Sequence, residues 1–264
     1  MPFGHNEYGR ETSRQRPRSV SGEPAHRFVL DGHQPSAAVP RHRDRSEDLG
    51  FSPGLGAILC HSVGAIIMTM KTSSRPVALQ DFVSELRKFP EAAFVETTTI
   101  LNFLQTTPVS PDTLAPYLTW DRQHYTRNLI DKTPLYELLA ICWEMGQVSS
   151  VHNHRDQNCW MAVPMGRLLV GNYRVIFQDL NAGKCRLEPA DTVEINPTHP
   201  CAVDPGEPVH RVYNPREFNE RAVSLHVYSR PFDTCVVYSP EQGTCGEIKL
   251  HYTTECGKPS AKTT

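Results

Sequence analysis

Several features that mark common classes of protein are missing from this chain of 264 residues. Its formal net charge is only -2 and it has no dense basic stripe, so nothing indicates nucleic-acid binding. The eight cysteines include no CxxC pair and no regular spacing, which argues against a zinc ribbon and against a disulfide framework. No N-terminal secretion signal is evident, so we expect reduced cysteines and a cytoplasmic protein.

No apolar run reaches the length of a membrane span, and no internal repeat is visible. The best candidate, residues 54–70, carries His61, Ser62 and three glycines. It falls short of the roughly 20 apolar residues that a spanning helix needs. We therefore expect no membrane partner. An alternative for this region is that translation begins at Met68 or Met70, just before the folded part.

The N-terminal segment is poor in aliphatic residues. Residues 1–53 contain eight Arg, seven acidic residues and six Pro. Such a segment cannot bury enough apolar surface to offset the entropy lost on ordering, and its acidic residues argue against a mitochondrial transit peptide. We interpret residues 1–71 as a disordered tail or a non-native extension, and residues 72–260 as the folded domain.

Local patterns predict short helices followed by many strands. Residues 76–89 have apolar side chains near helical spacing, with Pro76 suited to a first turn. A second helix is predicted to start at Pro111, with Ser110 as its cap. From about residue 124, short runs such as ELLAICW, AVSLHVYS and TCVVYS alternate with Pro, Gly, Asn and Asp clusters. This pattern predicts a mainly β protein, either a barrel or a sandwich.

The motif VHNH places His152 and His154 at positions i and i+2. On a strand both imidazoles point to the same face, where they can bind one metal ion. The pair alone does not decide between a metal site and a chance pair. Its surroundings favour the metal, because other residues complete a two-part pattern: Gly146, Gly166, Pro205, Gly206, His210 and Asn214.

This two-part pattern resembles that of the cupins, which implies a double-stranded β-helix (jelly-roll) barrel with short N-terminal helices. The resemblance implies that His152, His154 and His210 share one metal ion inside the barrel. Cupins commonly have a glutamate where this chain has Cys159. In this respect the chain is similar to the cysteine dioxygenase family, over roughly residues 75–260. Four segments carry the likeness in the same order: HYTRNLID, CWEMGQVSSVHNHRDQNCW, HRVYN and AVSLHVYSRPFDTC.

The resemblance implies an iron-dependent dioxygenase that converts L-cysteine and O2 into cysteine sulfinate, with one Fe(2+) per chain. Three neutral imidazoles leave open coordination positions, and imidazole suits iron. Without the glutamate the metal keeps its full charge, which attracts a thiolate by an extra energy on the order of several kcal/mol. Spacing alone does not separate iron from zinc, so a hydrolytic zinc site remains open at this point.

The same resemblance assigns residues to the substrate. It implies that Arg127 binds the substrate carboxylate, as a planar guanidinium suits bidentate binding. It implies that Tyr125 helps to place that carboxylate and that Cys235 lies near the substrate. The 3-mercaptopropionate dioxygenases tend to have glutamine for Arg127 and to lack Cys159, so we expect L-cysteine. The alternatives are 3-mercaptopropionate or another small thiol as substrate, or a cupin that binds metal or thiol without turnover.

In SLHVY, Ser224, His226 and Tyr228 alternate and face one way on a strand. Alternation alone also fits a polar barrel wall. The resemblance implies that Ser224 holds His226, that His226 positions Tyr228, and that Cys159 forms a thioether with the ring of Tyr228. Because His154 and Cys159 are five residues apart, a regular strand would point them to opposite faces, so we expect a turn or bulge between them.

Two further points concern the loops and the assembly. Relatives commonly carry two prolines where this chain has Arg230 and Pro231, and the first is thought to follow a cis bond. A cis bond before a non-proline residue costs about 3 kcal/mol, so we expect the loop to differ or its cis bond to lie elsewhere. The loop PREFNE also looks one residue longer than in animal relatives. By resemblance, the protein is expected to be a monomer.

Overall fold

The structure is a computed structural model that describes residues 75–206 and 208–260. The expected division after residue 71 and the predicted tail lie outside these residues. The described part is mainly β. Seven strands form one sheet: β1 (Thr126–Lys132), β2 (Glu137–Trp143), β4 (Asn158–Met165), β7 (Cys201–Ala202), β9 (Ala222–Ser229), β12 (Thr254–Glu255) and β13 (Lys258–Pro259).

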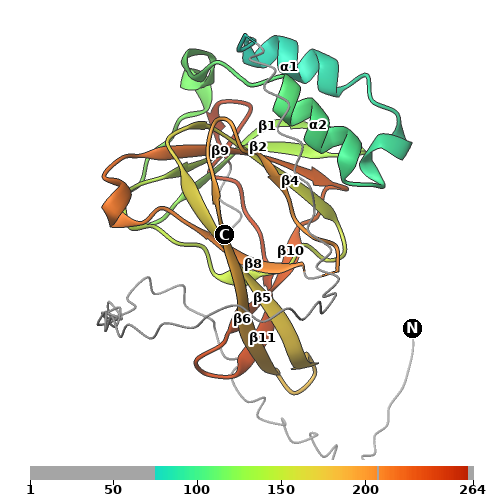
Figure 1. Cartoon of the computed structure of the whole chain (residues 1–264), viewed down its shortest axis with the longest axis vertical. Helices are drawn as coiled ribbons and strands as arrows, with labels where there is room; N and C mark the ends of the chain where they lie inside the picture. Colours follow the sequence, from blue (N-terminus) through green and yellow to red (C-terminus); the bar gives the residue numbers. More distant parts are fainter. Residues whose placement is uncertain (1–74, 207, 261–264) are drawn as a thin grey trace, which may run out of the picture. The chain divides into compact units, whose positions relative to one another are not determined.

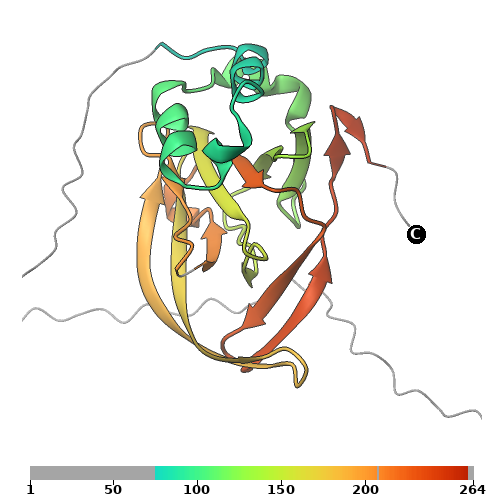
Figure 2. The same ribbon diagram turned by 90° about the vertical axis from the view of Figure 1, so that its right-hand side faces the viewer.

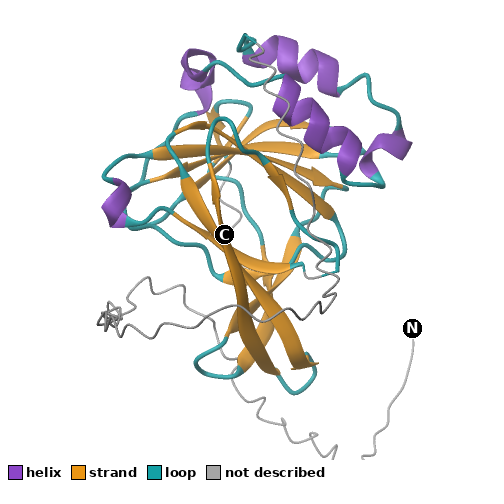
Figure 3. Ribbon diagram, in the orientation of Figure 1, coloured by secondary structure: helices purple, strands orange, loops and turns teal. Residues whose placement is uncertain are grey.

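The other strands form a second, closed system. They are β3 (Val151–His152), β5 (Leu168–Asp179), β6 (Lys184–Ile195), β8 (Val209–Tyr213), β10 (Thr234–Ser239) and β11 (Thr244–Lys249). The first sheet has the order β13-β12-β1-β2-β9-β4-β7, and the second closes in the order β10-β11-β6-β5-β8-β3. Figures 1 and 3 show the strands below α1 (Leu79–Leu86) and α2 (Thr98–Thr106). The predicted barrel with short N-terminal helices is confirmed.

The helices lie over the first sheet (Figures 1 and 2). The four helical elements before β1 share one apolar cluster with the outward-facing residues of β2, β4 and β9, whereas η3 (Arg216–Phe218) has no buried residue. Within the described ranges, no helix combines the length and the apolar character needed to cross a membrane. The helical elements are α1 (Leu79–Leu86), η1 (Glu91–Phe94), α2 (Thr98–Thr106), η2 (Pro111–Tyr117) and η3 (Arg216–Phe218).

Strands β2 and β9 are buried on both faces, and every residue of each is buried. On β2, Leu138 and Ala140 pack toward the helices, whereas Leu139 and Ile141 pack into the barrel. Because both faces are covered, β2 is apolar almost throughout, whereas β9 alternates apolar residues on the helix side with Ser224, His226 and Tyr228 on the other side. The runs ELLAICW, AVSLHVYS and TCVVYS coincide with β2, β9 and β10, as predicted.

Both predicted helices needed correction. The first begins at Leu79, because Val77 is drawn into a bridge with Val109. Pro76 therefore lies before the helix and not in its first turn. The second begins at Pro111 with Ser110 before it, but it is a 3-10 helix. The Ser110 side chain makes no capping bond; instead its carbonyl oxygen accepts a hydrogen bond from the Thr113 hydroxyl at 2.7 Å.

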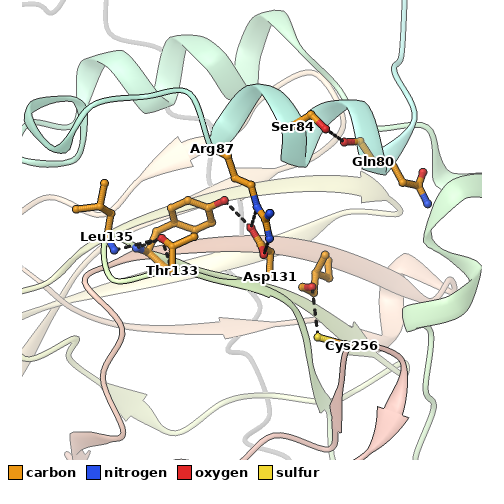
Figure 4. A network of polar contacts seen from close by, with 9 residues as sticks. Gln80, Ser84, Arg87, Asp131, Thr133, Leu135 and Cys256 are labelled. Atoms are coloured by element: carbon orange, nitrogen blue, oxygen red, sulfur yellow. Dashed lines mark hydrogen bonds and ion pairs between the residues drawn. The ribbon is translucent and has the colours of Figure 1, made fainter.

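Helix α1 is fixed to the barrel by a polar network that Figure 4 shows from close by. The Arg87 guanidinium forms an ion pair with Asp131 on β1, with an Nε–Oδ2 distance of 3.0 Å. The Tyr136 hydroxyl donates to the same carboxylate at 2.6 Å. Burial alone would raise the pKa of Asp131, but the hydrogen bonds from Arg87 and Tyr136 outweigh it and lower that pKa.

Two loops position the interior side chains. Arg155 and Asp156 both have positive φ, and Gln157 N donates to His154 O at 3.0 Å. This tight turn is the expected correction of strand parity between His154 and Cys159. The peptide bond between Ser229 and Arg230 is cis, so the expectation that this chain would move or lose the cis bond is wrong.

Gly166 is required by its backbone. Its φ is +74°, and a Cβ there would lie 2.4 Å from the Arg221 carbonyl oxygen on the neighbouring segment. Only glycine fits such a close approach at positive φ. The resulting turn between β4 and β5 carries the chain from one sheet to the other.

Candidate active site

Three histidines meet inside the barrel. His152 ends β3 and lies opposite His210 of β8. We expected one strand to carry both His152 and His154, but β3 ends at His152. The pairing with β10 extends one residue further, because Asn153 N donates a hydrogen bond to Val236 O at 3.1 Å. The candidate ligand nitrogens of the three imidazoles all lie within 4.8 Å of one another. They are the one group of three or more potential ligand residues found in the part of the chain that the structure describes.

The imidazoles are held neutral, with lone pairs available. Burial lowers the pKa of His152 to about 4 and lowers those of His154 and His210 well below the usual value. The Nδ1 atom of His152 lies 2.9 Å from the Ser150 carbonyl oxygen, which accepts its hydrogen and leaves Nε2 free. Both ring nitrogens of His154 and His210 are buried and have no hydrogen-bond partner. Buried polar atoms of this kind normally have a partner, and a metal ion fits this donor set.

Strand β9 carries a chain of hydrogen bonds. Ser224 Oγ lies 2.9 Å from His226 Nε2, and His226 Nδ1 lies 3.0 Å from the Tyr228 hydroxyl. The indole Nε1–H of Trp143 donates to Ser224 Oγ at 2.9 Å. Burial, with help from the charge of Arg127, lowers the pKa of His226 to about 3. The ring is therefore neutral and carries a single hydrogen.

The three residues expected at the substrate end also face this interior. The side chain of Arg127 on β1 has its Nε and Nη2 atoms buried without a partner. Its guanidinium carbon lies 6.0 Å from the centre of the Tyr228 ring. Tyr125 stacks on Trp143 with ring centres 4.6 Å apart. Cys235 on β10 is buried, which raises the pKa of its thiol to about 11, although Arg127 opposes this rise.

Cys159 faces the interior of the barrel beside Tyr228. The turn at Arg155 and Asp156 places Cys159 on β4 directly opposite Tyr228 on β9. Both side chains belong to the apolar cluster between the two sheets. Burial raises the pKa of Tyr228 well above its usual value, and the Cys159 side chain adds to the rise.

Sequence reasoning assigned no role to three residues near this centre. Trp143 was quoted only as part of a family segment, and its donor bond to Ser224 depends on tertiary structure. Phe232 follows the cis bond and lies against Tyr228, with ring centres 5.2 Å apart. Glu137 begins β2 and is fully buried opposite Tyr228. A glutamate inside a long apolar run is the signal that could have identified the third residue.

Comparison with known proteins agrees with this arrangement. The sequence model of the family described as Cysteine dioxygenase type I matches residues 68–241. Proteins named Cysteine dioxygenase type 1 are 25% identical over 185 residues in Danio rerio and 29% identical over 185 residues in Rattus norvegicus. These alignments cover 70% and 69% of this chain, and 90% of each relative.

Two of the solved structures that resemble the chain are described as a double-stranded β-helix protein and as a cupin. A Klebsiella pneumoniae protein with a double-stranded β-helix domain has a TM-score of 0.35 and 14% identity, covering 52% of this chain and 87% of that chain. A cupin-superfamily sugar phosphate isomerase from Silicibacter pomeroyi has a TM-score of 0.29 and 18% identity, covering 48% and 73%. Because the family model matches well over half of its length, the chain belongs to the cysteine dioxygenase type I family.

Proposed function

We propose that this chain is an iron-dependent dioxygenase that oxidises L-cysteine to cysteine sulfinate, with residues 72–260 as its catalytic domain. The observation that carries the proposal is that the Nε and Nη2 atoms of Arg127 are buried without a partner inside the same barrel as three neutral imidazoles. In the overall reaction both atoms of O2 are added to sulfur. A thiolate RS⁻ and O2 therefore give RSO2⁻, with no further reductant.

His152, His154 and His210 would hold one Fe(2+) per chain. The free nitrogens of these neutral rings supply the lone pairs that a metal ion needs. When bound, the ion would supply open positions for thiolate and O2 and exchange electrons with both. No carboxylate stands in this set, so an incoming thiolate meets a larger net positive charge than in a site of two histidines and one acid.

Arg127 would bind the substrate carboxylate. Its unpartnered Nε and Nη2 atoms lie on one edge of the guanidinium, which is the edge that binds a carboxylate bidentately. The backbone of Arg127 is fixed on both sides: its N donates to Thr253 Oγ1 at 3.1 Å, and its O accepts from Thr253 N at 2.7 Å. Tyr125 would support the same end of the substrate, and buried Cys235 would limit its size.

The chain of hydrogen bonds on β9 would aim a hydroxyl at the reacting groups. Because an indole N–H only donates, Ser224 Oγ accepts a hydrogen bond from Trp143. The Ser224 hydroxyl can then donate a hydrogen bond to His226 Nε2. The neutral ring then carries its hydrogen on Nδ1 and donates it to Tyr228 Oη. The Tyr228 hydroxyl is kept protonated by burial, so its own O–H is free to donate toward bound substrate or O2.

Cys159 would form a thioether with the ring of Tyr228. The reaction removes the thiol hydrogen and one ring hydrogen, and O2 would accept the two electrons and the two protons. The direct cross-strand pairing brings the two side chains side by side, since such pairs have Cβ atoms about 5 Å apart. A covalent bond there would also fix the direction of the Tyr228 hydroxyl.

We further propose a cytoplasmic monomer that acts on a small free thiol, with no nucleic-acid or membrane partner. This assignment follows the family and the absence of a basic stripe in the sequence. In this reading the Cys159–Tyr228 pair and Arg127 together favour L-cysteine over 3-mercaptopropionate, which has the same carboxylate but no amine.

The test compares two thiols on one preparation. The purified chain is loaded with iron, and O2 uptake and sulfinate are measured with L-cysteine and with 3-mercaptopropionate. We expect stoichiometric cysteine sulfinate, iron near one per chain, and loss of turnover in His152→Ala. Preference for 3-mercaptopropionate would reassign the substrate. Saturable binding of L-cysteine with no sulfinate would replace the enzyme by a non-catalytic cupin.

A further inference from the structure

Glu137 is a buried acid on the interior face of the barrel, and the reaction described above does not use it. It is the first residue of β2, with a relative exposure of 0%. Its cross-strand partners are Tyr228 on β9 and Lys132 on β1. Since directly opposed residues of an antiparallel pair share a face, the Glu137 side chain points to the same side of the sheet as Tyr228.

The carboxylate of Glu137 is only partly satisfied. Its Oε2 atom accepts a hydrogen bond from the Tyr252 hydroxyl and lies 3.5 Å from Lys132 Nζ. Lys132 Nζ in turn donates to the Tyr252 hydroxyl at 3.0 Å. The Oε1 atom is buried without a partner. The side chain of Lys132 is 45% exposed, so water screens its charge much more than that of Glu137.

Arg127 is a partly buried charged residue whose Nε and Nη2 atoms are buried in the same interior. Burial acts to lower the pKa of Arg127, but Tyr228, Tyr125 and Glu137 outweigh it and raise that pKa. The Nε and Nη2 atoms of Arg127 have no partner, so Glu137 leaves the carboxylate-binding edge of the guanidinium free. The two charges therefore interact across a poorly screened interior without forming a direct pair on that edge.

We propose that Glu137 is a positioning residue that limits how strongly Arg127 attracts the substrate carboxylate, with Lys132 as the counter-charge of Glu137. The inference rests on the proposed function, in which Arg127 binds that carboxylate. Negative charge at Glu137 partly cancels the positive potential at Arg127, and Lys132 restores part of it. Substrate and product carry the same carboxylate, so this balance governs both capture and release.

The inference predicts that removing the charge of Glu137 and removing that of Lys132 change the affinity for L-cysteine in opposite directions. In Glu137→Gln the negative charge is lost, and both KM and the anaerobic dissociation constant for L-cysteine should fall about three- to tenfold. In Lys132→Gln both constants should rise by a similar factor, and the double variant should lie between the two. Glu137→Asp keeps the charge and should return KM toward the wild-type value. The matched control is the exposed pair Glu85, on α1, and Lys88, just after it, whose glutamine variants should leave KM unchanged.

The outcomes separate this inference from the proposed function. A purely structural role for Glu137 predicts weaker binding in both single variants, and that result, or no change in either, would overturn the inference. If Glu137→Gln does not fold, Lys132→Gln decides alone, because its side chain is half exposed. If the wild type forms no sulfinate, the proposed function fails. The opposite changes in affinity are then measured by calorimetric binding of L-cysteine to the iron-loaded wild type and variants.

Discussion

Cys159 lies directly opposite Tyr228 across β4 and β9, and the two side chains are 0% and 2% exposed. They are 69 positions apart in the sequence, and they become neighbours only because the turn at Arg155 and Asp156 corrects the strand parity. We expect the thioether to accumulate during turnover with L-cysteine. Intact mass should then fall by the two hydrogens lost, and a doublet should appear on reducing gels.

The specificity of that crosslink can be checked with two cysteine variants. Cys159→Ser should remove the lighter species, whereas Cys201→Ser should keep it, because Cys201 is paired with Met161 and not with Tyr228. A single band of unmodified mass after many turnovers of the wild type would count against the crosslink.

Arg127→Gln should raise the KM for L-cysteine about 100-fold, because two charge-assisted hydrogen bonds to a carboxylate are together worth about 3 kcal/mol. Its kcat should fall less than its affinity. Steady-state sulfinate formation measures both quantities. Arg122→Gln is the matched control, since Arg122 is exposed just before β1. An unchanged KM in Arg127→Gln would show that the carboxylate binds elsewhere.

Trp143→Phe should lower kcat about tenfold and leave KM nearly unchanged, because Ser224 loses the donor that fixes the direction of its hydrogen. The ring that stacks on Tyr125 is largely kept. Trp160→Phe is a useful comparison: its Nε1–H donates to Thr97 O on the helix side of the sheet. That variant should lose some stability but keep its kcat, and equal kcat losses in both variants would argue against the relay.

Iron should stabilise the fold through the three histidines. Ligand at 100 times its dissociation constant adds about 2.7 kcal/mol to the free energy of unfolding, and we expect a rise in Tm of about 5–10 °C for a domain of this size. A chelator should reverse the rise. His154→Ala should melt at the same temperature with and without iron, and an iron-dependent shift that survives this substitution would place the metal elsewhere.

The network between α1 and β1 makes stability depend on pH. The folded pKa of Asp131 is lowered, so its contribution is present above the pKa of an unfolded aspartate and is lost as the pH falls through the folded value. Asp131→Asn should therefore lower the free energy of unfolding by about 2 kcal/mol at pH 7. The difference between variant and wild type should shrink in acid below about pH 4, as urea unfolding at several pH values would reveal.

Much of the barrel could be predicted from short apolar runs. Strands β2, β9 and β10 were predictable because each run is bounded by turn residues. Helix α2 was missed because TTILNFLQT is rich in threonine and has low helix propensity. Its first N–H groups are capped by the carboxylate of Glu96, which lies before the helix and accepts from Thr98 N and Thr99 N at 2.6 and 2.9 Å. Strand β3 is only two residues long and has no period of its own.

The candidate site likewise contains residues that the sequence could predict and residues that it could not. The three histidines were found from spacing and family likeness, and the grouping of their ring nitrogens within 4.8 Å of one another agrees with that expectation. Trp143, Phe232 and Glu137 were not found, because each comes near the site through a contact across strands or loops. The register that pairs Cys159 with Tyr228 is likewise set by the whole sheet and has no local signal.

Strand β12 runs parallel to β1, and Thr253 just before it holds both backbone groups of Arg127. A chain cleaved before Thr253 would keep every histidine of the metal site and the whole hydrogen-bond chain on β9. It would nevertheless lose the support that orients the guanidinium. Trimming by a carboxypeptidase should thus yield a protein that still takes up iron but has become indifferent to whether a thiol carries a carboxylate.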